Sequence, residues 1–248
     1  MNFFSLHKRN FLYKIKKKIN IDSESDFSGK SLEDIFVYYG TDKANFWKEK
    51  KSQGHGYTEY YEKNFIKIRN KNINILEIGS YSGASAASFV KYFPNSNVYC
   101  LDINISNFKF SSKKINVFGM DVSNSKMISK FYNKIGISSK EKFFDIIIDD
   151  GSHKLSDILF SINNFYKNLK KGGFYIIEDF KFPNYFKHLN DVDELKIDKL
   201  IRSFESNKDF SSKIINKEFK ECFKKENKKI SVYKGNFNYS DIVFFEKN

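Results

Sequence analysis

The sequence predicts an α/β fold with a mainly parallel sheet, covered by helices on both faces and finished by an antiparallel terminal strand. From about residue 72 onward, short apolar runs alternate with segments of helical periodicity. The runs are continuously apolar, as expected for strands that are buried on both faces of a parallel sheet. The last twenty residues contain two strand-like runs around a turn, which favours an antiparallel hairpin.

The elements follow one another in a regular order. The expected strands are 73–79, 97–103, 115–122, 144–150 and 173–180. Helices are expected at 84–93, before Pro94, at 125–135 and at 155–169. The last of these has apolar residues three and four positions apart, and Lys170, Lys171 and Gly172 suggest its C-terminal stop. The closing hairpin pairs 229–235 with 240–247.

Composition gives broader limits. With 248 residues, of which 40% are hydrophobic, the chain can form the core of a single domain. The net charge of +13 suits a nucleic acid, an acidic membrane or a phosphorylated substrate, but basic residues are spread along the whole chain, so a general bias is the preferred interpretation. Cys100 and Cys222 are far apart, which argues against a disulfide framework or a thiolate zinc site and fits a cytoplasmic location.

The N-terminal twenty residues contain six basic side chains and no acid. Their apolar runs are too short for a signal peptide or a membrane-spanning helix. The segment is therefore expected to be a basic arm that touches a membrane or another subunit, or a solvated or loosely docked tail.

Polar residues follow the first three strands, at the sheet edge where α/β proteins bind ligands. Glu77, Gly79 and Gly83 end the first strand, and their G-x-x-x-G spacing favours a ligand without a diphosphate over a dinucleotide. Asp102 could accept hydrogen bonds from ribose hydroxyls, and Asp121 could accept one from an adenine amine. Taken singly, these residues also suit a tight turn, a solvated acid or a helix cap. Together they indicate a nucleoside site.

The fourth and fifth strands end in a denser group of ionisable residues. Asp150 is followed by Gly151 for a turn, Ser152 as a helix cap and His153 in the first helical turn. Glu178 and Asp179 end the next strand. Converging carboxylates repel one another unless a cation neutralises them, and Mg²⁺ prefers oxygen ligands. We therefore expect a magnesium site with an imidazole beside it as a general base, whereas a plain turn is the alternative for the isolated motif.

The segment 38–65 precedes the sheet and is rich in turn-forming, polar and aromatic residues. It is expected either to fold over a cofactor as a lid or to be a capped helix with a surface loop. Its notable residues are Gly40, Thr41, Asp42, Lys43, His55, Gly56 and Tyr57.

Several of these stretches together resemble class I S-adenosylmethionine-dependent methyltransferases. The likeness is to the small metal-dependent sugar O-methyltransferase group, which includes the macrocin and mycinamicin enzymes and is related to cephalosporin-hydroxylase-like proteins. It covers about residues 36–246 and rests on the motifs YGTDK, HGYTEYYE, LEIGSYSG, CLDI, DIIIDDGSH, KKGGFYIIEDF and YSDIVFFEK.

The resemblance implies a Rossmann-like, doubly wound, seven-stranded sheet with an antiparallel C-terminal strand. The expected organisation is an arm at 1–35 and one methyltransferase domain at 36–248, made of a lid region at 36–71 and a core at 72–248. A homo-oligomer is also expected. Where the group has a polar run, this chain reads FKFPNYF at 180–186.

The resemblance also implies roles for single residues. His153 would be the general base, and Asp150, Glu178 and Asp179 would supply metal ligands, although which of the last two contacts the ion is open. The residues implied for cofactor binding are Thr41, Lys43, His55, Tyr57, Glu77, Gly79, Ser80, Gly83, Asp102, Asp121 and Asp149.

The sequence thus predicts an S-adenosylmethionine- and Mg²⁺-dependent O-methyltransferase. The expected acceptor is a hydroxyl of a sugar, a sugar nucleotide or a surface-polysaccharide precursor. The alternatives are a methyltransferase for RNA or another small molecule, and a non-catalytic adenosine-binding protein of the same fold.

Overall fold

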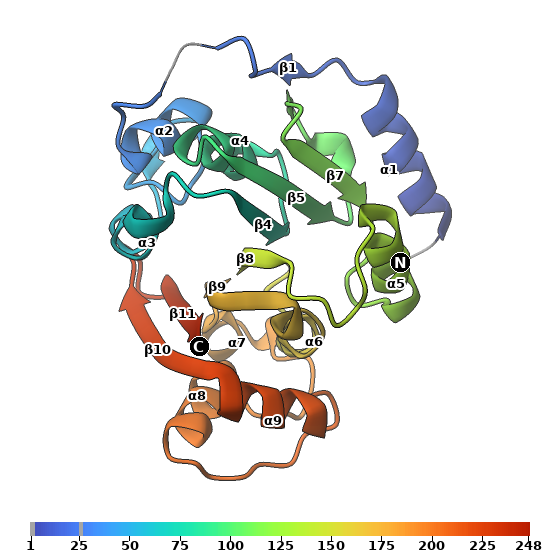
Figure 1. The fold of residues 1–248 in the computed structure, drawn as a ribbon, viewed down its shortest axis with the longest axis vertical. Helices are drawn as coiled ribbons and strands as arrows, with labels where there is room; N and C mark the ends of the chain where they lie inside the picture. Colours follow the sequence, from blue (N-terminus) through green and yellow to red (C-terminus); the bar gives the residue numbers. More distant parts are fainter. Residues whose placement is uncertain (1–2, 25–26) are drawn as a thin grey trace. The chain divides into compact units, whose positions relative to one another are not determined.

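The computed structural model describes residues 3–24 and 27–248 (Figure 1). The chain forms two compact units, residues 1–121 and residues 122–248. Each unit contains strands that pair with one another and its own buried side chains.

The first unit is built on three parallel strands. β4 (Ile73–Ile78) pairs with β5 (Ser96–Asp102), which pairs with β7 (Ile115–Gly119). α4 (Ala84–Tyr92) follows β4 and is almost entirely buried. These elements confirm the predicted strand–helix–strand order, and no end differs from its predicted position by more than three residues. β4 has one residue that is not fully buried, which fits its continuous apolar run.

An aromatic core joins the helices of this unit. α2 (Leu32–Tyr39) begins at a capping box of Ser31 and Asp34 and ends at Gly40, whose φ of 78° is left-handed. Phe36 of α2 contacts Phe89 of α4, with ring centroids 5.6 Å apart. The other elements are α1 (Phe3–Ile15), β1 (Ile19–Asn20), β2 (Phe46–Trp47), β3 (Ser52–Gln53), α3 (Thr58–Phe65), η1 (Ile66–Ile68), η2 (Ile105–Asn107) and β6 (Phe110–Ser111).

The second unit contains a mixed sheet. β8 (Phe144–Asp149) runs parallel to β9 (Leu169–Glu178), β9 pairs antiparallel with β11 (Asp241–Lys247), and β11 pairs antiparallel with β10 (Asn227–Lys234). The predicted closing hairpin is confirmed. The helices are α5 (Ser125–Ile135), α6 (Leu155–Phe165), η3 (Tyr166–Asn168), α7 (Phe182–Tyr185), η4 (Lys187–Leu189), α8 (Ile197–Glu205) and α9 (Lys217–Glu226).

The start of β9 corrects one prediction. Lys170, Lys171 and Gly172 were expected to stop a helix, but they lie inside β9. The pairing of β8 with β9 jumps from Phe144↔Leu169 to Ile146↔Phe174, so the extra residues of β9 bulge out between these pairs. Gly172 has a φ of 74° in this bulge, which explains the glycine better than a helix cap does.

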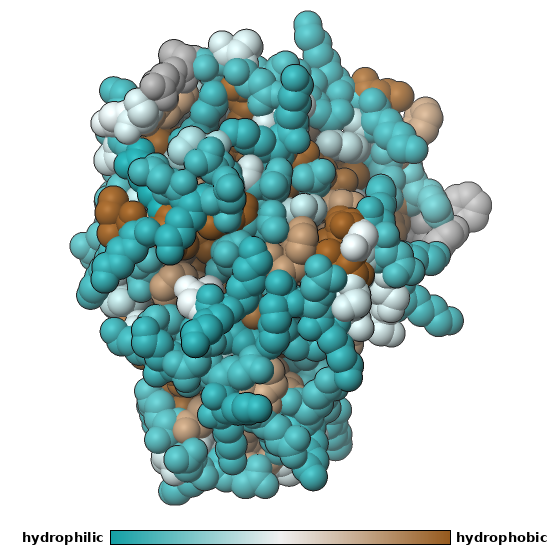
Figure 2. Space-filling view, viewed as in Figure 1, coloured by the Kyte–Doolittle hydropathy of each residue, from teal (hydrophilic) through white to brown (hydrophobic). Residues whose placement is uncertain are grey.

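The visible surface is mostly hydrophilic, with hydrophobic residues in small separate groups (Figure 2). In the described residues, no helix combines the length and the apolar character that crossing a bilayer requires.

Candidate active site

The first strand end of the first unit is a tightly turned loop. Glu77 is fully buried, and one of its carboxylate oxygens accepts a hydrogen bond from the Ser85 hydroxyl of α4. Gly79 then turns with a φ of 87°, and its N–H donates to the Leu101 carbonyl at 2.8 Å. The loop between β4 and α4 is therefore anchored at its start to β5. Ser80, also buried, donates from its hydroxyl to the Glu77 carbonyl at 3.4 Å.

Tyr81 was not among the predicted site residues. Its φ of 42° lies in the left-handed region, which is rare for a residue with a large side chain, and the side chain is 64% exposed. Strained backbone of this kind gathers at binding sites. An aromatic residue between the glycines at 79 and 83 was the sequence signal that could have revealed it.

Asp102 is held in one orientation by two backbone groups. Its Oδ2 accepts from the Tyr81 N–H at 2.7 Å, and its Oδ1 accepts from the Asn104 N–H at 2.5 Å. Each carboxylate oxygen can accept a second hydrogen bond. A half-buried, oriented carboxylate at the end of β5 thus fits the two hydroxyls of a ribose.

Gly83 has a structural reason to be glycine. Its φ is 77°, and an added Cβ would lie 2.4 Å from the Phe108 ring. The packing of this unit therefore accounts for the residue, and its contact with a ligand remains a prediction. Asp121, the last residue of the unit, is half-buried.

The predicted lid segment is a folded part of the first unit. Residues 42–45 and 54–57 pair through backbone hydrogen bonds, such as Tyr57 N–H to the Lys43 carbonyl at 2.8 Å. Thr41, Lys43 and Tyr57 are all buried, while His55 is half-exposed with its ring centroid 5.5 Å from that of Tyr57. A Cβ at Gly54 would lie 2.2 Å from the Ala44 carbonyl oxygen, so this close pairing requires glycine.

In the second unit, Asp149 is buried at the end of β8. Burial raises the pKa of its carboxyl to about 8, while hydrogen bonds from the Gly151 N–H and the Ser161 hydroxyl oppose that rise. Its Oδ2 accepts no hydrogen bond in the part of the chain that the structure describes. A contact between Asp149 and a cofactor remains a prediction.

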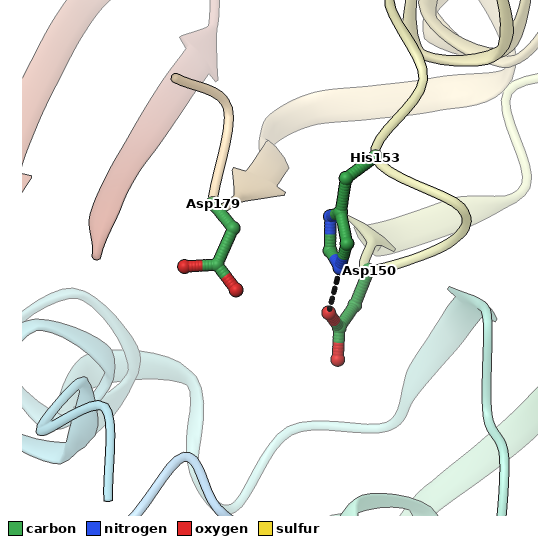
Figure 3. A group of neighbouring side chains, drawn as sticks. All are labelled: Asp150, His153 and Asp179. Carbon is green, nitrogen blue, oxygen red and sulfur yellow. Dashed lines mark ion pairs between the residues drawn. The ribbon is translucent and has the colours of Figure 1, made fainter. Parts of the chain in front are cut away.

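Asp150, His153 and Asp179 converge beyond the ends of β8 and β9 (Figure 3). One ligand atom from each side chain lies within 4.8 Å of the others. The Nε2 of His153 is 3.7 Å from the Oδ1 of Asp150. Of the residues at 3–24 and 27–248, these three form the group that could hold a metal ion. We call them the acidic cluster.

The position of His153 differs from the prediction. It was expected in the first turn of a helix with Ser152 as the cap, but α6 begins only at Leu155. His153 has a φ of 56°, so the chain makes a left-handed turn before the helix starts. The Ser152 hydroxyl accepts from the Lys154 N–H at 3.3 Å and donates to Asp157 at 2.5 Å. The loop itself therefore places the imidazole beside Asp150.

Asp179 is also held in a left-handed conformation, with a φ of 51°. Its carbonyl accepts from the Phe182 N–H at 2.8 Å, and Lys181 pairs with the buried Asp241 of β11 at 2.7 Å. Glu178 is buried in β9 opposite Ile242 and lies outside the acidic cluster as described. Of the two acids that the sequence left open, Asp179 is the one beside Asp150 and His153.

An aromatic wall, formed by Phe182, Phe186, Phe237 and Tyr239, lies next to His153. The Phe182 ring centroid is 4.8 Å from that of His153 and 5.6 Å from that of Tyr239. Tyr239 in turn stacks on Phe237 at 5.3 Å with ring planes 13° apart. All four rings are half-exposed. The aromatic wall was not predicted from the sequence. The signal that could have revealed it is FKFPNYF at 180–186, which puts aromatic residues directly after Glu178 and Asp179.

The acidic cluster has the donor set of a hard divalent cation. Carboxylate oxygens from Asp150 and Asp179 are the ligands that Mg²⁺ prefers, and Mg²⁺ commonly takes only one or two carboxylates from a protein. The imidazole nitrogen is less suited to Mg²⁺ than to proton transfer. The residues present therefore fit a Mg²⁺ ion with an adjacent base.

No family model matches the chain. Part of it is similar to mycinamicin VI 2''-O-methyltransferase of Micromonospora griseorubida, at 28% identity over 50% of this chain and 31% of that protein. A similar part is 31% identical to L-olivosyl-oleandolide 3-O-methyltransferase of Streptomyces antibioticus, over 53% of this chain and 34% of the relative. These matched regions span about a third of each curated relative.

The fold is that of a known methyltransferase structure. MycE, from the mycinamycin biosynthetic pathway and in complex with Mg, SAH and mycinamycin VI, superposes with a TM-score of 0.65 and 21% identity. The superposition covers 88% of this chain and 54% of MycE. The resemblance to class I methyltransferases of the sugar O-methyltransferase group is thus confirmed.

Proposed function

We propose that this chain is an S-adenosylmethionine- and Mg²⁺-dependent O-methyltransferase that acts on a sugar hydroxyl. The observation that carries the proposal is the convergence of Asp150, His153 and Asp179. The names of the relatives support a sugar acceptor, and the complex of MycE with Mg and SAH supports the metal and the methyl donor.

The first unit would bind the methyl donor. The oriented carboxylate of Asp102 would accept hydrogen bonds from the ribose, and the loop at 79–83 would offer its backbone and the exposed Tyr81 ring. The predicted contacts of Thr41, Lys43, His55, Tyr57, Glu77, Ser80 and Asp121 belong to the same proposal. Asp149, a residue of the second unit, is proposed as a further contact of the cofactor. Bound there, S-adenosylmethionine supplies an electrophilic methyl group on a sulfonium ion.

The acidic cluster would prepare the acceptor. Asp150 and Asp179 would hold Mg²⁺, which when bound lowers the pKa of a coordinated hydroxyl. His153 would take the hydroxyl proton while the acceptor oxygen bonds the methyl carbon and the carbon–sulfur bond breaks. Asp150, 3.7 Å from Nε2, would stabilise the imidazolium that forms. Most of the remaining catalysis would come from positioning.

The aromatic wall supports a carbohydrate acceptor. Half-exposed ring faces beside the candidate base suit the C–H faces of a sugar ring, because aromatic faces carry partial negative charge. The sugar hydroxyls would remain free to reach the cluster. A non-catalytic adenosine-binding protein would have no need of such a convergence of acids, imidazole and rings.

The acceptor class includes finer predictions. A sugar nucleotide or a surface-polysaccharide precursor would match the net charge of +13, since both carry phosphate. The relative from Streptomyces antibioticus is named instead for a sugar on a small molecule, L-olivosyl-oleandolide. A cytoplasmic location, a homo-oligomer and the doubly wound, seven-stranded sheet of the group complete the proposal.

The test is methyl transfer from methyl-labelled S-adenosylmethionine to a panel of glycosides, nucleotide sugars, polysaccharide fragments and RNA, with Mg²⁺ present. We expect label on a sugar oxygen and no transfer when EDTA is in excess. Transfer to RNA alone would replace the sugar acceptor, and full activity in excess EDTA would remove the metal from the mechanism.

A further inference from the structure

One face of α1 packs on the rest of the first unit, and the opposite face is exposed to solvent. Leu6 is buried, the Tyr13 ring meets the Phe108 ring edge-on at 6.3 Å, and the Asn10 amide donates to the Gly119 carbonyl at 3.1 Å. These positions recur three and four residues apart, so they share one side of the helix. Figure 1 shows α1 alongside β7, where Gly119 ends the strand.

Further contacts fix the helix on its unit. Arg9 donates to the Ile103 carbonyl at 3.2 Å, and Lys16 donates to the Ser106 carbonyl at 2.9 Å. A Cβ at Gly119 would lie 1.7 Å from the Asn10 side-chain oxygen, so the helix approaches β7 as closely as a glycine permits. The predicted basic arm is therefore a docked helix with a defined outer face.

The outer face is apolar. Phe11 is 61% exposed, Leu12 40% and Ile15 64%, and all three lie opposite the docked side. Ile19, just beyond the helix, is 54% exposed. Eleven large hydrophobic side chains are exposed in the described part of the chain, and four of them fall within residues 11–19. Such a concentration marks an interaction surface.

Basic residues lie on and beside this face, since Lys8 is one helical turn before Phe11 and Leu12. Lys8, Lys14 and Lys17 are exposed, and the first acidic residue of the chain is Asp22. Exposed apolar side chains in a segment with several basic residues and no acidic one complement an anionic lipid surface. A second copy of the chain would bring the same positive charges to the contact, which costs free energy.

We propose that α1 and residues 16–19 form a docking surface for an anionic lipid bilayer. Phe11, Leu12 and Ile15 enter the interface between headgroups and acyl chains, while the lysines contact lipid phosphates. The helix lies in the plane of the membrane and does not cross it. This inference stands on the first unit alone and does not depend on the proposed methyl transfer.

The test is co-sedimentation of the full chain with vesicles, either of pure phosphatidylcholine or of an equimolar mixture with phosphatidylglycerol. We expect binding to the anionic vesicles that weakens as salt is added. The variant Phe11→Gln/Ile15→Gln should bind at least about tenfold more weakly, because two apolar side chains no longer enter the interface. Glutamine keeps good helix propensity, and circular dichroism checks the fold.

Two further variants sharpen the result. Lys8→Gln/Lys14→Gln/Lys17→Gln should lose binding on the order of 100-fold, about fivefold for each lysine near the surface. The matched control Ile66→Gln/Val232→Gln removes two exposed apolar side chains from other places and should bind as the unchanged chain does.

Three results would overturn the proposal. One is equal sedimentation with neutral and anionic vesicles, and another is no sedimentation with either. The third is an oligomer in light scattering that Phe11→Gln/Ile15→Gln converts to a monomer without vesicle binding, because the face would then join copies of the chain.

Discussion

Two groups of charged side chains in the second unit use their carboxylates for opposite purposes. The acidic cluster brings the like charges of Asp150 and Asp179 to one point with a single imidazole. The second group, the Glu226 network, sets one acid between two lysines. The Glu226 Oε2 lies 2.6 Å from the Lys142 Nζ and 2.8 Å from the Lys247 Nζ.

The Glu226 network is satisfied from within the protein. Burial alone would raise the pKa of Glu226, but hydrogen bonds from Lys142 and Lys247 outweigh it and lower the pKa to about 2. Lys247 is only 2% exposed, and its Nζ also donates to the Tyr166 carbonyl at 3.2 Å. Burial lowers the pKa of Lys247 to about 8.

The difference distinguishes a candidate metal site from a structural ion-pair network. Opposite charges with short contacts stabilise the fold by themselves, and removing one partner leaves a buried charge uncompensated. Carboxylates that lie close together repel one another, and a bound cation relieves that repulsion. The acidic cluster should therefore matter for ligands and the Glu226 network for stability.

The largest expected effect is on metal binding. Asp150→Asn and Asp179→Asn should each weaken Mg²⁺ or Mn²⁺ binding by at least about 100-fold, because each removes a charged oxygen ligand. Calorimetric titration with the metal measures this. The control Asp193→Asn changes an exposed acid of the same unit and should leave affinity unchanged. Unaltered affinity in both cluster variants would contradict the metal site.

The second effect is on turnover. His153→Ala should lower kcat by about 10²- to 10⁴-fold while S-adenosylmethionine affinity is kept, because a general base contributes to the chemical step. Steady-state kinetics on the acceptor found in the panel, with cofactor binding measured separately, would show it. His7→Ala removes an exposed imidazole from α1 and serves as the control. Equal kcat in both variants would exclude His153 as the base.

The third effect breaks the Glu226 network instead. Glu226→Gln should lower the free energy of unfolding by about 2–3 kcal/mol at neutral pH, since Lys247 loses its charged partner. Urea denaturation measures the change. Glu221→Gln, which removes an exposed i,i+4 pair with Lys217, should cost less than about 0.5 kcal/mol. Equal stability of Glu226→Gln and Glu221→Gln would contradict a structural role for the Glu226 network.

The Glu226 network also predicts that the stability of the protein depends on pH. Because the folded-state pKa of Glu226 is lowered from 4.5 to about 2, its stabilisation is full above pH 4.5 and is lost as the pH falls toward 2. The stability difference between the unchanged chain and Glu226→Gln should shrink over this window. A difference that stays constant from neutral pH to pH 2 would show that Glu226 is not held as a carboxylate.

The smallest expected effect concerns the aromatic wall. Phe182→Ala should raise the KM for a sugar acceptor by about tenfold, because apolar contact with the sugar ring is lost. Tyr185→Ala, on the same short helix and 51% exposed, is the matched control. An unchanged KM for Phe182→Ala would remove the wall from acceptor binding.

Strongly patterned elements were predictable. The continuous apolar runs gave β4, β5 and β8 close to their observed ends, and 125–135 matches α5 completely. The beginning of β9 was not predictable. Lys170, Lys171 and Gly172 come directly after a segment with helical periodicity, and only the pairing of β9 with β8 reveals the bulge. Tertiary contacts decided the outcome there.

The candidate site was predictable in composition but not in detail. Strand ends indicated that Asp150, His153 and Asp179 lie together, because the parallel strands β8 and β9 deliver their carboxyl ends to one edge. The left-handed turn at His153 could not be predicted, because glycine, and not histidine, is the residue that indicates this conformation. The aromatic wall joins 182–186 to 237–239, which are far apart in sequence.

The left-handed backbone at His153 and Asp179 has a consequence for protein engineering. Glycine adopts such a conformation freely, whereas other residues bear a cost of about 1 kcal/mol or more there. Selection of this chain for heat resistance alone should therefore favour His153→Gly and Asp179→Gly. The more stable protein would lose the proposed base and the proposed metal ligand in the same step. Thermal stability and the proposed chemistry therefore compete at residues 153 and 179.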